Sequence, residues 1–335
     1  MIYSAKLSSK IIKNIVFNKI RGIEKGPYTL MLEPLFKCNL NCTGCGRIRE
    51  YREVLSQKLS VAECVDAAKQ AKASIISITG GEPLIHPQIK EIVNELLKRG
   101  YFIYLCTNGL LLSDFVNEIK AKKELSFVVH LDGFSKVHNS LAGADNVFEK
   151  AVEGIKKAVK LNFRVITNTT IYKDTDENQI LNLFYFLMKL GVQGVLVSPG
   201  FKYDSIENRD MFMEKTQICK TFANIFSKLD NIKIYNTPLY WEFLQGKTNL
   251  KCMPWSNPTF NVKGWKSPCY LVTDCHFPTY REYIENTPWE KYGADTDERC
   301  LNCMMHCGFE ASAISNAGIK DLLKILKWNF SGKIS

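Results

Sequence analysis

Six apolar segments rich in β-branched residues alternate with segments of helical periodicity, and this alternation restricts the fold more than any other feature. The expected strands cover residues 28–36, 74–80, 101–108, 125–133, 163–172 and 194–200. Between them, residues 60–72, 86–100, 146–160 and 177–191 carry apolar residues at helical spacings of three and four. Successive β-α units form a parallel sheet with right-handed crossovers. The sequence therefore predicts an α/β fold, with a six-unit, TIM-like partial barrel favoured over an open sheet.

The pattern changes after about residue 245. Residues 251–310 contain five prolines and six cysteines and show little periodicity. Such a segment cannot build a large core of its own and needs a metal or the barrel to hold it. We expect a basic amphipathic helix over residues 1–25, the barrel over 26–245, and a Cys-rich extension over 246–335 that ends in an amphipathic helix.

Charge and hydropathy restrict the location and the partners. The chain has 44 Lys and Arg against 34 Asp and Glu, a net charge of +10, which suits nucleic acid, anionic lipid or an acidic protein. No apolar run reaches the roughly 18 residues that span a bilayer, and Lys13 and Asn14 interrupt the stretch where a signal peptide has its core. We expect a cytoplasmic protein with reduced cysteines and no nucleic-acid partner.

The sequence LFKCNLNCTGCGRIRE (35–50) places Cys38, Cys42 and Cys45 at CX3CX2C spacing directly after the first expected strand. Barrel enzymes carry their chemistry at this end of the strands. Thiolates bind zinc, iron–sulfur clusters or copper. A zinc site needs a fourth ligand, and the histidine nearest in sequence is His86. On a four-iron cluster, the same three thiols leave one iron open to a ligand from outside the protein.

The CX3CX2C spacing resembles the motif of the radical S-adenosylmethionine (SAM) superfamily. The resemblance implies a [4Fe–4S] cluster on Cys38, Cys42 and Cys45, with SAM as the ligand of the fourth iron. It also implies an electron donor, such as flavodoxin or ferredoxin, and reductive cleavage of SAM to methionine and a 5′-deoxyadenosyl radical. The superfamily usually has an aromatic residue before the last cysteine. This chain has Gly44, so ring packing on the cofactor must come from elsewhere.

The sequence TGGEP (79–83) ends the second expected strand. Glycines permit close backbone approach, and a carboxylate complements an ammonium group. The resemblance implies that Gly80, Gly81 and Glu82 hold the methionine amino group of SAM. By their positions at later strand ends, the candidates for ribose or methionine contacts are Asn108, His130, Asn168 and Ser198. Each of these four side chains has the alternative role of satisfying backbone groups in a loop.

Cys106 lies inside the third expected strand, in the sequence YLCTNG. Alternation along a strand puts Tyr104, Cys106 and Asn108 on one face, so Cys106 points into the barrel if Asn108 does. A free cysteine is a common small core residue. The functional alternative is a hydrogen-atom donor, because the S–H bond of a thiol is weak enough to quench a carbon radical.

The C-terminal cysteines form a second group. The segment from Cys252 to Cys269 resembles the CX9–15GX4C pattern of the twitch and SPASM extensions of this superfamily, which hold auxiliary clusters. Residues 300–307 add a CX2CX3C motif. The candidates for the four ligands of a second [4Fe–4S] cluster are Cys252, Cys269, Cys300, Cys303 and Cys307, with Cys275 and His306 outside this set. A zinc site in the same place is the alternative.

Two basic amphipathic helices are expected at the ends of the chain. The first carries Ile11, Ile12, Ile15, Val16 and Ile20 among Lys10, Lys13, Lys19 and Arg21. The second carries Leu322, Leu323, Ile325, Leu326 and Trp328 among Lys320, Lys324 and Lys327. Such helices usually pack on the domain and expose a charged face. The alternative is peripheral contact with anionic lipid on the inner face of the membrane.

Longer blocks narrow the resemblance. NPTFNVKGWKSPCYL (257–271) and CMMHCGFE (303–310), with others between residues 28 and 312, are similar to the hopanoid-biosynthesis members of the superfamily. This implies that SAM is a co-substrate whose 5′-deoxyadenosyl radical adds to the terminal alkene of diploptene to form adenosylhopane, with quenching by Cys106. Two alternatives stay open: a peptide-modifying radical SAM enzyme with an auxiliary cluster, and a non-catalytic iron–sulfur or zinc protein.

Overall fold

The computed structural model describes residues 2–315 and 317–332. Six parallel strands lie beside one another in chain order. They are β1 (Thr29–Glu33), β2 (Ile75–Ile78), β3 (Phe102–Thr107), β4 (Leu125–His130), β5 (Arg164–Ile171) and β6 (Val195–Pro199). Each lies within one of the six ranges that the sequence predicts. The prediction of an α/β fold with a TIM-like partial barrel is confirmed.

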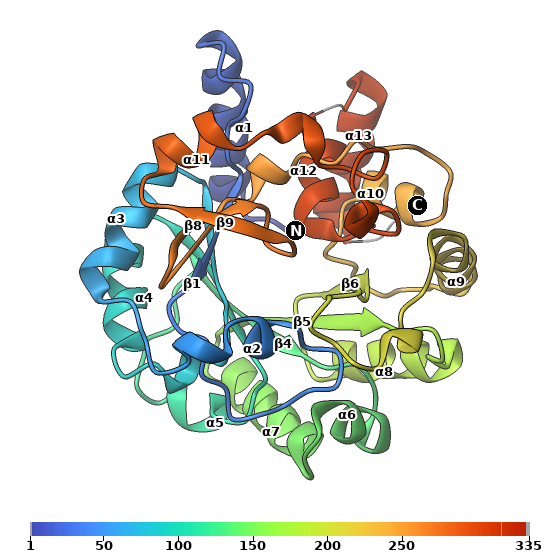
Figure 1. Ribbon diagram of the computed structural model, residues 1–335. Coiled ribbons are helices and arrows are strands. Elements are labelled where there is room, and N and C mark those ends of the chain that lie inside the picture. Colours follow the sequence, from blue (N-terminus) through green and yellow to red (C-terminus); the bar gives the residue numbers. More distant parts are fainter. Residues whose placement is uncertain (1, 316, 333–335) are drawn as a thin grey trace.

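Helices cover the outer face of the curved sheet (Figure 1). Helical periodicity predicts α3 (Val61–Ala71), α4 (Ile89–Lys98), α7 (Val147–Lys160) and α8 (Glu177–Lys189), and α5 (Leu112–Phe115) and α6 (Ser135–Ala142) lie between them. Helix α3 begins with a capping box, in which Ser60 and Glu63 each accept a backbone N–H of the other. Outward side chains of the strands, such as Ile103 and Leu105, are fully buried beneath the helices and form the main core.

The Cys-rich extension continues the barrel sheet instead of forming a sheet of its own. After α9 (Lys215–Ser227) and α10 (Pro238–Leu244), β7 (Thr259–Asn261) pairs parallel with β1, and β8 (Gly264–Pro268) and β9 (Thr273–Phe277) follow antiparallel. The expected boundary at residue 245 falls at the end of α10. The remaining helices are α2 (Arg47–Glu50), α11 (Tyr280–Asn286), α12 (His306–Ser315) and α13 (Ile319–Ser331), with short 3-10 helices at Arg52–Val54, Pro83–Ile85, Arg209–Met211, Pro254–Ser256, Trp289–Lys291 and Glu298–Cys300.

Helix α1 (Ala5–Ile20) lies against the amino ends of the strands. Leu7 packs with Ile75 and Phe102, the first residues of β2 and β3. The Lys10 ammonium lies 5.0 Å from the ring centre of Tyr101. Within residues 2–315 and 317–332, no helix combines the length and apolar character needed to cross a bilayer.

Candidate functional site

The three N-terminal cysteines lie on the loop that leaves the carboxyl end of β1, and all three line one cavity of about 430 Å³. The backbone N–H of Leu40 donates to the Cys38 sulfur at 3.4 Å, and the Arg49 guanidinium donates to the carbonyl oxygens of Cys42 and Cys45. Burial raises the pKa of Cys38 to about 11 and that of Cys42 to about 12, and the neighbouring Cys45 thiol adds to both shifts. Thiols with raised pKa values need a nearby cation to become thiolates, and three thiols on one loop fit the donor set of an iron–sulfur cluster.

The Gly80–Gly81 turn packs directly on the start of this loop. The Gly81 N–H donates to the Leu35 carbonyl at 3.0 Å, and the Glu82 N–H donates to the Lys37 carbonyl at 3.0 Å. A Cβ atom on Gly80 or Gly81 would overlap these backbone oxygens. Gly80 also has φ of +111°, which side-chain-bearing residues rarely adopt. The glycines are therefore required for the close approach of the β2 turn to the cysteine loop.

The Glu82 carboxylate is 1% exposed and holds the end of β3. It accepts hydrogen bonds from the N–H groups of Leu84 at 3.0 Å and Asn108 at 2.8 Å, and from the Thr107 hydroxyl at 2.8 Å. Burial raises its pKa to about 7 although these hydrogen bonds oppose the shift. Glu82 lines the main cavity, and its contact with the methionine amino group stays a prediction.

The four polar candidates at later strand ends line the same cavity: Asn108, His130, Asn168 and Ser198. The Asn108 amide donates to the Asn39 side chain at 2.8 Å and lies 3.9 Å from the Cys38 sulfur. His130 and Asn168 are register partners on β4 and β5, with ring and amide nitrogens 3.4 Å apart. The structure brings these candidates together, and their contacts with SAM remain predictions.

Asp132 is a polar residue of this site that the sequence pattern does not single out. Its carboxylate lies 2.7 Å from Nε2 of His130 and accepts the Thr170 N–H at 2.7 Å. Burial disfavours the charged imidazole, but the Asp132 carboxylate raises the pKa of His130 above its ordinary value. Asp132 therefore orients His130, and its position two residues beyond it in HLDG is the local signal that points to it.

Two tyrosines pack on the glycines of the cysteine loop. A Cβ atom on Gly44 would overlap the hydroxyl group of Tyr172, and one on Gly46 would overlap the ring of Tyr203. Both tyrosines line the main cavity. Tyr172 thus fills the space that a side chain at position 44 would take; it comes from the end of β5, and no sequence signal links it to Gly44.

Cys106 faces the cavity together with Tyr104 and Asn108, while Leu105 is fully buried on the other side of β3. The Cys106 sulfur lies 3.6 Å from the Ser77 hydroxyl oxygen on the adjacent strand. Burial raises the pKa of Cys106 to about 11. The thiol therefore keeps its hydrogen at neutral pH.

The wall of the cavity changes from polar to apolar along the barrel. The apolar residues that line it include Met31, Ile75, Val128 and Leu196 from the strands and Ile11 from α1. Ile75 and Ile11 lie at the amino ends of the strands, opposite the cysteine loop. One cavity therefore connects the cysteines, Cys106 and the inner side of α1.

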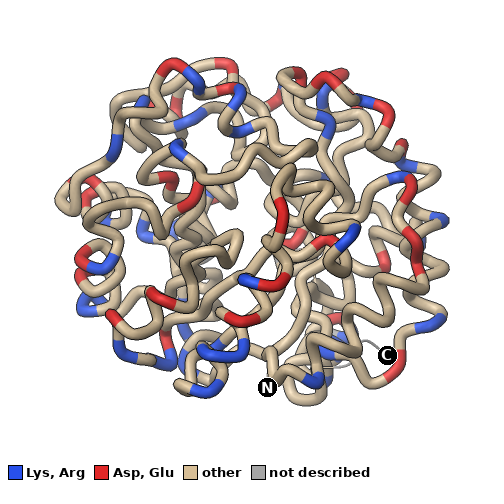
Figure 2. The backbone as a smooth tube through the Cα atoms, turned by 90° about the horizontal axis from the view of Figure 1, so that it is seen from below, with Lys and Arg blue, Asp and Glu red and all other residues tan. Residues whose placement is uncertain are grey.

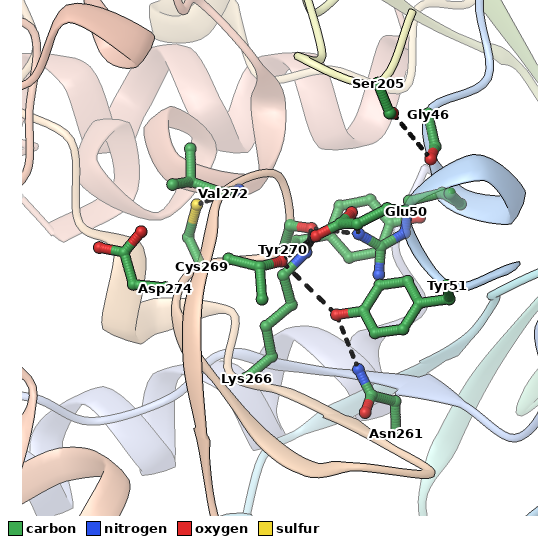
Figure 3. Close-up of polar contacts among 12 residues, drawn as sticks. Gly46, Glu50, Tyr51, Ser205, Asn261, Lys266, Cys269, Tyr270, Val272 and Asp274 are labelled. Carbon is green, nitrogen blue, oxygen red and sulfur yellow. Dashed lines mark hydrogen bonds and ion pairs between the residues drawn. The ribbon is translucent and has the colours of Figure 1, made fainter. Parts of the chain in front are cut away.

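A buried polar network ties the cysteine loop to the β8–β9 hairpin (Figure 3). Arg47, two residues after Cys45, forms a buried ion pair with Glu33 and donates to the Tyr270 carbonyl at 3.1 Å. The Lys266 ammonium donates to the same carbonyl at 2.7 Å and lies 3.7 Å from the Glu50 carboxylate. Burial lowers the pKa of Lys266 to about 7, and the Arg47 charge acts in the same direction.

The five C-terminal candidates gather around a second, smaller cavity: Cys252, Cys269, Cys300, Cys303 and Cys307. Cys275 is exposed, and His306 lines the main cavity instead. Burial raises the pKa values of Cys252, Cys303 and Cys307, with neighbouring thiols adding to each shift. In the described part of the chain, no three His, Cys, Asp or Glu side chains are arranged as ligands of one metal ion. The five thiols form a donor set that suits a second cluster.

Two family models cover most of the chain. The model of the radical SAM superfamily matches residues 32–187, and that of a domain of unknown function (DUF3463) matches residues 195–327. A probable GTP 3′,8-cyclase of Methanococcus maripaludis is 26% identical over 71% of this chain and 83% of its own. A cofactor-modifying protein of the tungsten-containing aldehyde ferredoxin oxidoreductase from Pyrococcus furiosus is 27% identical over 76% of this chain and 73% of its own.

The fold is similar to that of SuiB from Streptococcus suis, solved with its precursor peptide SuiA. The TM-score is 0.66 at 15% identity, over 91% of this chain and 76% of that one, which shows the shared fold alone. The cofactors of the radical SAM superfamily are a [4Fe–4S] cluster and SAM, and the Cys-rich C-terminus allows a second cluster. The superfamily match covers the strands and loops that carry Cys38, Cys42, Cys45 and the Gly80–Gly81 turn, and residues 32–187 of this chain are a radical SAM domain.

Proposed function

We propose that this radical SAM enzyme is an adenosylhopane synthase, which joins the 5′-deoxyadenosyl group of SAM to the terminal alkene of diploptene. Cys106 then donates the hydrogen atom that completes the product. The observation that carries the proposal is the position of Cys106 in the cavity that the cysteine loop and an apolar wall share.

The cluster and SAM, when bound, supply the 5′-deoxyadenosyl radical, and the residues of the chain hold and direct the partners. The polar end of the cavity offers Asn108, His130 and Asn168 to SAM, and the apolar end accommodates a hydrocarbon skeleton. The two ends meet near Cys106, where the barrel holds the radical and the alkene in reacting geometry.

Cys106 is suited to hydrogen-atom transfer because its raised pKa preserves the S–H bond. Addition of the adenosyl radical to the terminal alkene carbon leaves a tertiary carbon radical, which takes the hydrogen atom of the thiol. The sulfur-centred radical left on Cys106 returns to the thiol by uptake of one electron and one proton. A flavodoxin or ferredoxin as electron donor is part of the proposal.

A peptide-modifying radical SAM enzyme with an auxiliary cluster is the second candidate. Two observations favour it: the five C-terminal cysteines gather around one cavity, and the fold is similar to that of SuiB, which was solved with a peptide. The comparisons support this candidate more than a lipid substrate, whereas the apolar cavity wall and Cys106 support the lipid substrate.

One experiment separates the candidates. The protein, reconstituted without oxygen, is incubated with SAM, a reductant and diploptene, and both the lipid extract and the aqueous phase are analysed by mass spectrometry. An adenosyl adduct of diploptene supports the first candidate. Free 5′-deoxyadenosine without a lipid adduct supports the second, and a peptide substrate is then sought. Uncleaved SAM supports a non-catalytic iron–sulfur or zinc protein.

A further inference from the structure

Exposed apolar side chains concentrate on the two terminal helices. Among the described residues, nine of the thirteen large exposed apolar side chains lie on α1, on the turn after it and on α13: Ile12, Val16, Phe17, Ile20, Ile23, Leu322, Leu323, Leu326 and Phe330. Ile20 is 80% exposed and Phe330 is 67% exposed. The other four, Val137, Leu161, Tyr185 and Leu301, lie on different elements. Single exposed apolar residues are ordinary, whereas a group of nine marks an interaction surface.

The residues just before α1 contact the last turn of α13, so the two helices adjoin each other on one side of the molecule. The N–H groups of Ile2 and Tyr3 donate to the backbone and side-chain oxygens of Asn329 at 2.8 and 2.7 Å. The rings of Tyr3 and Trp328 are 5.5 Å apart. Figure 1 shows α1 and α13 on the side of the molecule away from α5, α6 and α7. We call the nine exposed side chains of this region the terminal-helix face.

The charges on these helices complement an anionic surface. The sequence of α1 contains four lysines and no acidic residue, and that of α13 contains three lysines and one aspartate. Lys6 and Lys324 pair with Glu124 and Glu242 at 2.7 and 2.8 Å, while Lys13 is exposed beside Ile12. Figure 2 shows Lys and Arg positions along the lower edge of the molecule, near the N label. An apolar stripe bordered by lysines is typical of helices that bind anionic membrane interfaces.

The terminal-helix face adjoins the main cavity through α1. Ile11 lines the cavity from inside, and its chain neighbour Ile12 belongs to the exposed face. Tyr3 also lines the cavity, next to Trp328 of α13. The apolar wall that leads to Cys106 thus begins at the helices that carry the exposed apolar side chains.

We propose that the terminal-helix face docks on an anionic lipid bilayer and sets the amino-end side of the barrel against the membrane. An apolar lipid substrate then passes between α1 and the barrel to reach Cys106. The docking proposal depends only on the two terminal helices. The passage of a lipid substrate rests on the proposed function.

Docking is tested on the full-length reconstituted enzyme by flotation with vesicles of phosphatidylcholine, alone or mixed with phosphatidylglycerol, without substrate. The variant Ile20→Ser/Leu323→Ser/Phe330→Ser should lower the partition coefficient at least about tenfold, because three side chains no longer enter the interface. The control Leu161→Ser/Tyr185→Ser/Leu301→Ser removes exposed apolar side chains elsewhere and should bind as the wild type does. Lys13→Glu/Lys320→Glu/Lys327→Glu should abolish the preference for phosphatidylglycerol.

Equal vesicle binding by the apolar variant and the wild type would overturn the docking proposal. The docking proposal would also be overturned if the wild type sedimented as a dimer and the apolar variant as a monomer, because a second copy of the chain would then cover the terminal-helix face. SAM cleavage by each variant checks that the barrel is folded. Product formation in detergent without vesicle binding refutes docking but keeps the proposed function, and vesicle binding without lipid product refutes the proposed function but keeps docking.

Discussion

The Cys106 sulfur lies 3.6 Å from the Ser77 hydroxyl oxygen across the β2–β3 pair. Five cysteines of the described chain line the main cavity: Cys106 and, besides it, Cys38, Cys42, Cys45 and Cys307. The contact with Ser77 fixes the position of the Cys106 side chain. Its S–H bond is therefore held at a defined place between the polar and apolar ends of the cavity.

Cys106→Ala should still cleave SAM and form the adenosyl adduct, but the adduct should be unsaturated or quenched at random. The reason is that the other cysteines lining the cavity, Cys38, Cys42, Cys45 and Cys307, are the expected ligands of clusters. In D₂O, the wild type should place one deuterium at the quenched carbon, since a thiol exchanges its hydrogen with solvent, and mass spectrometry reads this directly. A fully saturated, deuterium-labelled product from Cys106→Ala would show that Cys106 is not the hydrogen-atom donor.

Cys38→Ala should abolish SAM cleavage, because two thiols cannot hold the cluster in the superfamily's manner. The matched control is Cys64→Ala, which removes a fully buried thiol of the α3 core and should leave cleavage intact. The measurements are iron and sulfide content and the yield of 5′-deoxyadenosine or adduct. Normal cleavage by Cys38→Ala would show that this thiol is no ligand.

Arg47→Met should lower the free energy of unfolding by about 3–5 kcal/mol, since it leaves the buried Glu33 carboxylate without its ion-pair partner. Adding Glu33→Gln should recover part of this loss. Arg281→Met removes a similar but exposed pair with Glu285, for which we expect at most about 1 kcal/mol. Urea denaturation measures the free energy of unfolding of the three variants. Equal losses for Arg47→Met and Arg281→Met would contradict the larger contribution of the buried ion pair.

Glu82 should make the protein less stable as pH rises from about 4.5 to about 7. Its folded-state pKa is raised from 4.5 to about 7 by burial, so the folded protein holds this proton over a range in which the unfolded chain releases it. Glu82→Gln should flatten the decline of the unfolding free energy with pH in this window. Glu91→Gln, on the exposed face of α4, is the control, and an unchanged slope in Glu82→Gln would contradict the burial effect.

Tyr172→Ala should weaken SAM binding on the order of threefold to tenfold, the value of one aromatic contact. Gly44→Phe should be poorly folded in the wild-type background because its side chain overlaps Tyr172. The double variant Gly44→Phe/Tyr172→Ala should recover folding and SAM affinity, because the ring then comes from the loop. Titration with SAM measures the affinity, and its saturation measures the folded fraction. If the double variant bound SAM no more tightly than either single variant, the ring of Tyr172 would not substitute for a ring at position 44.

The sequence predicts the elements whose patterns are local. The six strands, the four long helices between them and the inward direction of Tyr104, Cys106 and Asn108 follow from periods of two and 3.6 residues. The cysteine loop and the glycine turn are adjacent because the carboxyl ends of parallel neighbours meet at one edge.

The parts that the sequence does not predict depend on contacts between distant residues. Tyr172 fills the space beside Gly44, and Lys266 of the β8–β9 hairpin forms an ion pair with Glu50, which follows the cysteine loop. No spacing rule relates such pairs. The terminal helices are a mixed case: the stripe predicts amphipathic helices, but only the structure shows that Trp328 is buried while Ile12 and Leu323 are exposed.

The pairing of β7 with β1 has a consequence for how the two groups of thiols are held relative to each other. Met31 and Glu33 of β1 are register partners of Thr259 and Asn261, so the strand that precedes the cysteine loop is hydrogen-bonded to β7, which pairs in turn with β8, the strand directly before Cys269. Both thiol groups are therefore attached to one continuous hydrogen-bonded sheet, which fixes the distance between them without any closure of one domain on another.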